Sequence, residues 1–226
     1  SRFTAPAAQC PVICDAWEDP AGVPIDIFVF GGKRTNTVPL VHEAFDWEHG
    51  VFMGATASSE PTAAALDLGN VSLRFDPFAM TPFIGYHAGD YMQNWFNMGD
   101  KLGDNAPRCF YVNWFRKSED GKWLWPGFGE NSRVLKWMCD RVEGKVGARE
   151  TAIGLMPEGD DLTLDGLDIP AEDWDALMAV DNDGYKVTLA DMKTYLAKFG
   201  DKLPSKISAQ VDKLDEIGRA SCRERV

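Results

Sequence analysis

Residues 113–133 read NWFRKSEDGKWLWPGFGENSR, and this stretch decides how the rest of the 226-residue chain is interpreted. It holds five aromatic side chains: Trp114, Phe115, Trp123, Trp125 and Phe128. Two turns interrupt them, at 119–122 and 126–129, where glycine permits positive φ and lets the backbone come close to a ligand. Apolar residues at helical spacing then predict a helix over 133–143, with Asn131 and Ser132 as its N-cap. The sequence therefore predicts flat aromatic faces beside one carboxamide.

This combination of side chains suits a planar heterocycle. Stacking of a base on an aromatic ring contributes roughly 1–3 kcal/mol but does not distinguish one base from another. The amide of Asn131 offers both a donor and an acceptor, so it supplies the choice between bases. The alternative is that the rings are core residues, since aromatic side chains usually bury themselves. Five rings around two glycine turns favour a purine site.

Several motifs resemble the GTP-dependent phosphoenolpyruvate carboxykinase family. NWFRK at 113–117 and PGFGENSRVL at 126–135 resemble its guanine-binding segment. Other stretches resemble the same family in the same order: SRF at 1–3, QCP at 9–11, FGGKR at 30–34, HGVF at 49–52, SE at 59–60, TAAA at 62–65 and DPFAM at 76–80. The resemblance is collinear from residue 1 to about residue 154 and weaker through residue 214. It covers roughly the last third of the family's chain, so we expect this sequence to be a fragment.

The resemblance implies a set of contacts to GTP or GDP. They fall on Arg2, Lys33, Trp114, Phe115, Trp123, Phe128, Gly129, Glu130 and Asn131. Arg2 corresponds to a catalytic arginine that bridges the substrate carboxylate and the transferred phosphate, and Ser1 to a neighbouring substrate contact. Lys33 stands where the family carries an arginine that contacts nucleotide phosphate. Lysine keeps the charge but lacks the bidentate fork. Glycines followed by Lys33 and Arg34 at a strand end also suggest a phosphate cradle.

A segment of small residues follows residue 54. It has few large apolar side chains to bury, so its local stability is low, as a closing lid requires. The resemblance implies a mobile Ω-loop lid at 61–71, and the lid residues are Glu60, Pro61, Thr62, Ala63, Ala64 and Ala65. Ser58 and Asp67 depart from the family's common arginine and histidine.

The predicted fold is a mixed α/β fold, the C-terminal nucleotide-binding portion of a carboxykinase-type domain, with a mixed sheet and flanking helices. The apolar run 25–30 predicts a strand covered on both faces. Further strands are expected at 51–53, 71–75 and 108–115. Helices are expected near 89–98, after Pro170, from a cap at Thr188, and over 207–214.

Residues 1–155 then form a partial nucleotide-binding domain and 156–215 its helical C-terminal part. Residues 216–226 break the helical period and resemble a non-native, adapter-derived tail.

Composition and motifs argue against several classes of protein and of binding site. A formal charge of −12 disfavours binding to nucleic acid, and no apolar run reaches the ~20 residues that span a membrane. Five cysteines without C-x-x-C spacing disfavour zinc and disulfides and favour a reducing cytoplasm. The GFGENS run lacks a third glycine for a dinucleotide fingerprint. The DNDG run at 181–184 would place alanines at the first and last calcium-ligand positions. No G-x-x-x-x-G-K-[ST] phosphate loop occurs.

Two functions remain open from the sequence. The resemblance implies that the whole enzyme converts oxaloacetate and GTP to phosphoenolpyruvate, CO2 and GDP in gluconeogenesis, as a cytoplasmic monomer. Its Mn2+ and Mg2+ would be held by residues upstream of residue 1, so no metal ligand is expected in this chain, and we expect the chain alone to be inactive. The alternative is a non-catalytic aromatic-rich module that stacks its tryptophans on a nucleotide, a sugar or another apolar ligand.

Overall fold

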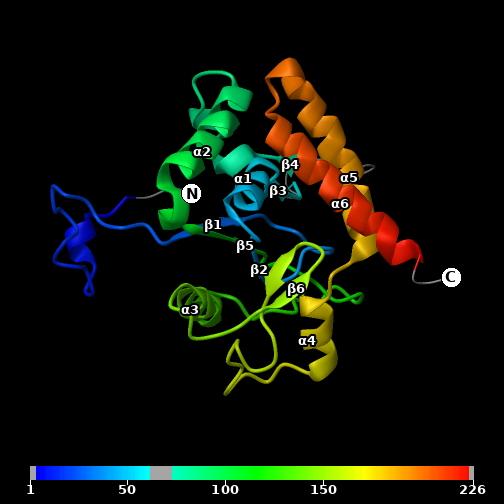
Figure 1. The fold of residues 1–226 in the computed structure, drawn as a ribbon. Helices are drawn as coiled ribbons and strands as arrows, with labels where there is room; N and C mark the ends of the chain where they lie inside the picture. The colour runs from blue at the N-terminus through cyan, green and yellow to red at the C-terminus, as the bar shows by residue number, and fades with distance from the viewer. Residues whose placement is uncertain (1–3, 62–72, 224–226) are drawn as a thin grey trace.

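The computed structural model describes residues 4–61 and 73–223, with side chains described as far as residue 216. A mixed five-stranded sheet in the order β1-β5-β2-β7-β6 lies at its centre (Figure 1). The strands are β1 Ile27–Gly31, β2 Val41–Glu43, β5 Arg108–Val112, β6 Arg149–Thr151 and β7 Gly154–Met156. Strand β1 runs parallel to β5, whereas the pairs β5–β2, β2–β7 and β7–β6 are antiparallel. A short pair, β3 Ser58–Ser59 and β4 Arg74–Phe75, stands beside this sheet.

Strand β1 lies at the edge of the sheet, and the prediction that both of its faces are covered is wrong. Val29 in its middle is 43% exposed. The interior position next to β1 belongs to β5, where Phe110 is fully buried. An apolar run indicates that a strand packs against other residues. It does not reveal whether the strand lies at the edge of its sheet or how completely its faces are covered. Gly31 pairs with Val112, so β1 and β5 end at the same edge of the sheet.

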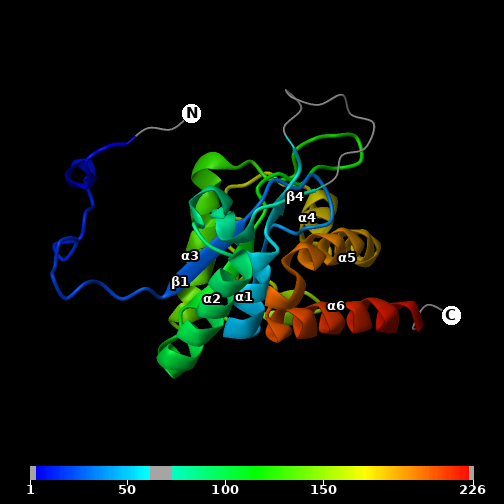
Figure 2. The same cartoon turned by 90° about the horizontal axis from the view of Figure 1, so that it is seen from above.

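Helices cover both faces of the sheet. On one side lie α1 Trp47–Ala55, α2 Ala88–Leu102, α5 Asn182–Leu196 and α6 Ser205–Arg223, and on the other lie α3 Asn131–Val142 and α4 Ala171–Met178 (Figure 1). Short 3-10 helices are Ala7–Gln9, Pro77–Ala79, Thr81–Phe83, Gly103–Asn105, Phe128–Glu130 and Ala197–Lys202. Seen from above, α5 and α6 run alongside each other (Figure 2). The mixed α/β class with flanking helices is thus confirmed.

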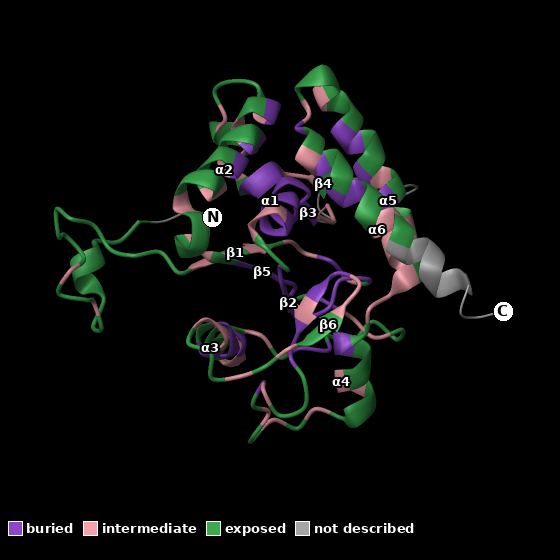
Figure 3. Cartoon of the chain, viewed as in Figure 1, coloured by how far each residue is buried: buried purple, intermediate pink, exposed green. Residues whose placement is uncertain are grey.

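Helix α1 replaces the short strand predicted after His49. Asp46 caps it, because its Oδ1 accepts a hydrogen bond from the His49 amide over 2.7 Å. The helix is buried nearly all round (Figure 3), so its sequence shows no amphipathic period and resembles a buried strand. A Cβ on Gly50 would lie 2.5 Å from the Cys109 side chain, so glycine lets the helix lie directly on β5.

Two hydrophobic clusters join early and late parts of the chain. One packs Leu40 and Phe110 with Met156 and Leu177, and therefore binds α3 and α4 to the sheet. The other packs Phe52 and Met92 with residues of α5 and α6, which include Leu189, Met192, Ile207 and Val211. Burial of these side chains supplies most of the driving force for this arrangement. The division of the chain at residue 155 remains a prediction, although both parts contribute to both clusters.

Two predicted helix boundaries are wrong. Helix α5 begins at Asn182, and its cap is Asp181, whose Oδ1 accepts from the Gly184 amide over 2.9 Å. Thr188, the predicted cap, therefore lies inside the helix and is buried. The DNDG run that resembles half a calcium loop is thus the start of a helix. Helix α6 continues past Glu216 to Arg223, although a break in periodicity was expected there.

Residues 4–26 lie apart from the sheet, as a blue arm at one side of the molecule (Figure 1). Their apolar side chains stay largely exposed, as Val12 at 86% illustrates. None of the described helices is both long enough and apolar enough to cross a lipid bilayer.

Candidate functional site

Two loops leave the sheet at the edge where β1 and β5 end: residues 32–38 after β1 and residues 113–130 after β5. Asn113 joins them and is completely buried. Its Nδ2 donates to the carbonyl oxygens of Arg34 and Val38 over 2.9 and 2.8 Å. Its Oδ1 accepts from the amides of Arg34 and Phe115, each over 3.2 Å. One side chain therefore uses its full hydrogen-bonding capacity to hold the two loops together.

The two cations after β1 point in different directions. Arg34 is 4% exposed and turned into the protein, whereas Lys33 is half-buried with its ammonium 5.9 Å from the centre of the Phe115 ring. The Lys33 ammonium has no hydrogen bond or ion pair within residues 4–61 and 73–216. A Cβ on Gly32 would lie 2.0 Å from the Ser58 carbonyl oxygen. Glycine at position 32 therefore allows this loop to pack closely on β3. Of the two cations in the predicted phosphate cradle, only Lys33 points outward.

The ring of Trp123, at the end of the hairpin 117–123, meets the ring of Phe115 edge to face. The Phe115 and Trp123 centroids are 6.0 Å apart and the ring planes are inclined at 71°. A bridge between Lys117 and Trp123 closes the hairpin, and the Lys117 ammonium lies 4.3 Å from the Trp123 ring centre. Both rings are partly exposed. Trp114 instead packs against the cluster around α3 and α4, so the structure places it on the core side.

Phe128 stands apart from the other rings. Its side chain is 99% exposed, and it has no ring partner within the described part of the chain. Gly127 and Phe128 both have positive φ, of 72° and 49°. A left-handed conformation at a residue with a side chain costs of order 1 kcal/mol, and such strain gathers at binding sites. The sequence predicted this glycine turn but not that strain extends to Phe128.

The Asn131 amide lies against a buried indole. Trp125 Nε1 donates to Asn131 Oδ1 over 2.8 Å, and Trp125 is buried. Asn131 is the first residue of α3 rather than its cap, and the cap residue Glu130 makes no side-chain capping bond. Glu130 Oε2 instead accepts from Arg133 Nε over 2.5 Å, and the Gly129 carbonyl accepts from Ser132 Oγ over 2.7 Å.

The remaining predicted residues divide into two groups. Glu60 and Pro61 are described, and Glu60 faces the loop after β1, where its Oε1 accepts from the Thr35 amide over 2.7 Å. The others lie outside the described residues: Ser1, Arg2, Thr62, Ala63, Ala64, Ala65 and Asp67.

Sequence reasoning missed the role of Asn113 and the buried direction of Arg34. For Asn113 a signal existed, because it is a polar residue at the end of an apolar strand at the edge where ligands bind in open α/β sheets. The buried direction of Arg34 has no local signal.

The described residues do not fit a metal. Within residues 4–61 and 73–216, no three His, Cys, Asp or Glu side chains come together as possible ligands. Burial lowers the pKa of His42 to about 3, with the charge of His49 as a smaller cause. Burial likewise lowers the pKa of His49 to about 4. Both imidazoles are structural.

Comparison with known proteins adds independent findings. The profile of the phosphoenolpyruvate carboxykinase C-terminal P-loop domain matches residues 1–217. Proteins named phosphoenolpyruvate carboxykinase [GTP] are similar to this chain. The one from Corynebacterium kroppenstedtii is 49% identical over 212 residues, covering 94% of this chain and 34% of its own length. That from Corynebacterium jeikeium is 51% identical over 207 residues, covering 92% and 34%.

A third relative gives the same result. The protein of that name from Treponema pallidum (strain Nichols) is 48% identical over 217 residues, covering 95% of this chain and 35% of its own length. The chain spans about a third of the length of the curated relatives it matches. These findings confirm the resemblance carried by the motifs around residues 113–133. The chain belongs to the GTP-dependent phosphoenolpyruvate carboxykinase family and corresponds to the C-terminal domain of that family.

Proposed function

We propose that this chain binds GTP and GDP at the edge where β1 and β5 end, as the guanine-recognition part of a phosphoenolpyruvate carboxykinase. Exposed rings on the hairpin and on the glycine turn supply stacking faces, and Lys33 supplies a cation for phosphate. The family membership and the printed names of the relatives support GTP or GDP as the ligand.

The observation that carries this proposal is the hydrogen bond between Trp125 and Asn131. An indole N–H only donates, so the amide oxygen of Asn131 must face Trp125. The amide nitrogen is then left to face a ligand, since no residue in the described part of the chain accepts from it. An N–H donor suits the carbonyl O6 of guanine and opposes the amino group of adenine, which is itself a donor. The buried indole thus sets the base preference.

The rings and the cation have separate tasks. Phe115, Trp123 and Phe128 bury a base by stacking, with roughly 1–3 kcal/mol from each ring that makes contact. Lys33 lies beside Phe115, so its ammonium is close to a base on that ring and within reach of a phosphate attached to it. A lysine acts on phosphate as a point charge.

The reaction belongs to the whole protein. Oxaloacetate loses CO2 to give an enolate, whose oxygen attacks the γ-phosphorus of GTP, and the bond to the leaving GDP oxygen breaks to give phosphoenolpyruvate. We place Arg2 at the substrate carboxylate and transferred phosphate, with Ser1 beside it. Mn2+ and Mg2+, a cytoplasmic location, a monomeric state and a role in gluconeogenesis are proposed for the whole protein. The 226 residues contain no G-x-x-x-x-G-K-[ST] loop, and we propose that the chain alone binds nucleotide without turnover.

Tryptophan fluorescence of the chain tests the binding proposal. GDP is expected to quench the emission, whereas ADP and a soluble oligosaccharide at equal concentration leave it nearly unchanged. Asn131→Asp keeps an acceptor for Trp125 and removes the outward donor, so GDP affinity should fall by about tenfold or more, as for loss of a hydrogen bond together with an added negative charge. Equal quenching by ADP overturns guanine selectivity, and a response to the sugar alone favours the non-catalytic module. Measurable carboxylation by the chain would contradict its proposed inactivity.

A further inference from the structure

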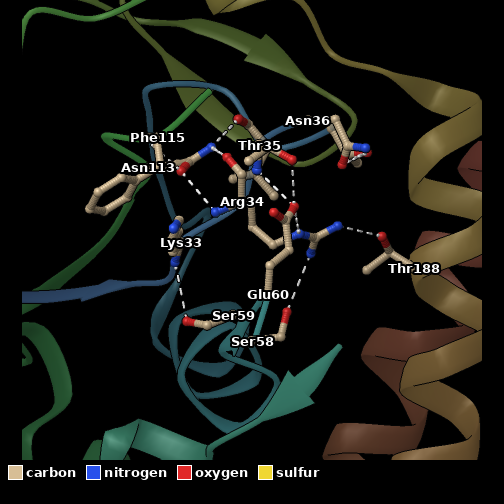
Figure 4. A network of polar contacts seen from close by, with 12 residues as sticks. Lys33, Arg34, Thr35, Asn36, Ser58, Ser59, Glu60, Asn113, Phe115 and Thr188 are labelled. Atoms are coloured by element: carbon tan, nitrogen blue, oxygen red, sulfur yellow. Dashed lines mark hydrogen bonds and ion pairs between the residues drawn. The ribbon is translucent and has the colours of Figure 1, made fainter. Parts of the chain in front are cut away.

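The guanidinium of Arg34 is held between two separate parts of the chain, the 58–60 segment and α5 (Figure 4). Its Nη1 donates to Ser58 Oγ over 3.3 Å, and its Nη2 donates to Thr188 Oγ1 on α5 over 3.0 Å. Its Nε lies 4.0 Å from Glu60 Oε1 and makes no hydrogen bond within the described residues. A side chain so enclosed does not contact a ligand in solution. Its planar fork instead fixes the geometry of whatever it joins.

Glu60 completes this arrangement from the other side of the loop. Its Oε1 accepts from both the amide and the hydroxyl of Thr35, over 2.7 and 3.0 Å. Its own amide donates to the Lys33 carbonyl over 2.8 Å. The Lys33 amide in turn donates to Ser59 Oγ over 3.1 Å. The backbone on both sides of Lys33 is therefore tied to the 58–60 segment, while the Lys33 ammonium is left out of these bonds.

We propose that Arg34 and Glu60 are positioning residues for Lys33, and that Thr188 of α5 is the anchor against which they act. This inference rests on the proposed function, because it assigns to Lys33 the contact with nucleotide phosphate. The buried pair does not touch the nucleotide. It sets the path of residues 33–35, so that the Lys33 ammonium faces the phosphates of a base stacked at Phe115.

The energetics of the contact between Arg34 and Glu60 favour a role in positioning the loop over a role in stabilising the fold. Burial of an ion pair costs desolvation energy that its attraction often fails to recover, so such pairs are poor evidence for stability. Here the nearest charged atoms are 4.0 Å apart, and the shorter contacts are the directional bonds to hydroxyl and amide groups. Those bonds select one loop conformation, which an apolar side chain of similar volume does not do.

The test compares the affinities for GDP and for guanosine, which lacks phosphate. Thr188→Val removes the hydroxyl and keeps the volume, and Glu60→Met removes the carboxylate that accepts from Thr35 and keeps the length of the side chain. Each is expected to lower the affinity for GDP by about fivefold, the usual effect of one lost hydrogen bond, with guanosine affinity changed by less than about twofold. Thr194→Val is the matched control, because the exposed Thr194 hydroxyl bonds only to Ala190 of its own helix. It should leave both affinities unchanged.

A double-mutant cycle distinguishes positioning from general loosening. On a Lys33→Ala background, Glu60→Met should cause no further loss of GDP affinity, because Arg34 and Glu60 act through Lys33. Equal losses for GDP and guanosine, additive losses in the cycle, or no loss in either single variant would each overturn the assignment. Failure of the unmodified chain to bind GDP would overturn the proposed function itself, and the assignment with it. Calorimetry or equilibrium dialysis gives all of these affinities directly.

Discussion

The indole of Trp125 and the amide of Asn131 share one hydrogen bond of 2.8 Å at the start of α3. The donor is buried and the acceptor is half-exposed, so a core residue orients a surface residue. Because the indole offers a donor alone, rotation of the amide by 180° would set two donors against each other. The base preference of the proposed site is thus determined by a side chain that a nucleotide does not touch.

Trp125→Phe should weaken the preference for GDP over ADP. The change keeps most of the buried volume but releases the amide, and loss of one hydrogen bond corresponds to about a fivefold change in the ratio of dissociation constants. Trp137→Phe is the matched control, because Trp137 is equally buried and its Nε1 has no partner within the described residues. Competition binding measures the ratio. An unchanged ratio in Trp125→Phe, or an equal fall in both variants, would contradict the orientation argument.

Phe128→Ala should separate binding from stability. The side chain is fully exposed, so the free energy of unfolding should change by less than about 0.5 kcal/mol. The affinity for GDP should fall by the roughly 1–3 kcal/mol of one stacked ring. Phe128→Gly should also relieve the positive φ, and we expect it to be at least as stable as the alanine variant. Phe83→Ala removes another exposed ring and should change neither quantity. Normal GDP binding by both Phe128 variants would remove this residue from the site.

Stability should fall as the pH drops below about 6.5. His42 and His49 have folded-state pKa values of about 3 and 4, both lowered chiefly by burial, against 6.5 when unfolded. The unfolded chain therefore binds protons that the folded chain does not, so this stability is fully present above pH 6.5. The free energy of unfolding decreases by about 1.4 kcal/mol per pH unit for each imidazole as the pH falls toward the folded-state pKa values.

Urea unfolding at pH 7 and pH 5 measures this loss, with His42→Phe as the decisive variant. The phenyl ring retains stacking on Tyr111, whose ring centre is 5.6 Å from that of His42. The variant should lose about half as much stability between the two pH values as the unmodified chain, since one titrating imidazole remains. An identical pH dependence would show that the pKa of His42 does not differ between the folded and unfolded states.

Glu43→Gln should destabilise the fold without affecting nucleotide binding. Glu43 is 4% exposed, and its carboxylate accepts from Arg141 Nε over 2.7 Å and from Arg108 Nη1 over 3.2 Å. Removal of the charge leaves two guanidinium groups without their counter-ion. Because Arg108 is partly exposed, we expect a loss of about 2–3 kcal/mol, below the usual range for a fully buried pair.

The matched control is Glu150→Gln. Glu150 is exposed and opposes Leu155 on β7, the same residue that Glu43 opposes from the other side. It should lower the free energy of unfolding by less than about 0.5 kcal/mol. Chemical denaturation and GDP titration of both variants check the two expectations. A lowered GDP affinity in Glu43→Gln would show that this end of the sheet is coupled to the site.

Local chemistry made some of the structure predictable. The glycine turn before Phe128 and the helix after Asn131 follow from residue types whose preferences act over a few positions, so both were found in the sequence. Helix α1 was mistaken for a strand because burial on all sides removes the periodicity that identifies a helix. The edge position of β1 was missed because an apolar run does not reveal which strands lie beside it.

Long-range partners explain what was missed in the site. Lys33 and Arg34 are adjacent basic residues, and nothing nearby distinguishes the outward side chain from the buried one. The difference comes from Thr188, which is 154 positions away and offers its hydroxyl to the guanidinium. Asn131 was predicted from the sequence as a site residue, but the orientation of its amide depends on its hydrogen bond with the buried Trp125.

The bond between Arg34 and Thr188 also has a consequence for synthesis on the ribosome. At about 5–20 residues per second, the anchor emerges roughly 8–30 s after the loop that it holds. Until α5 has left the exit tunnel and docked, the loop after β1 has its bonds to Asn113 and to the 58–60 segment, but the Arg34 guanidinium lacks the Thr188 hydroxyl. The final placement of Arg34 beside the proposed phosphate site is therefore reached only after α5 has been made.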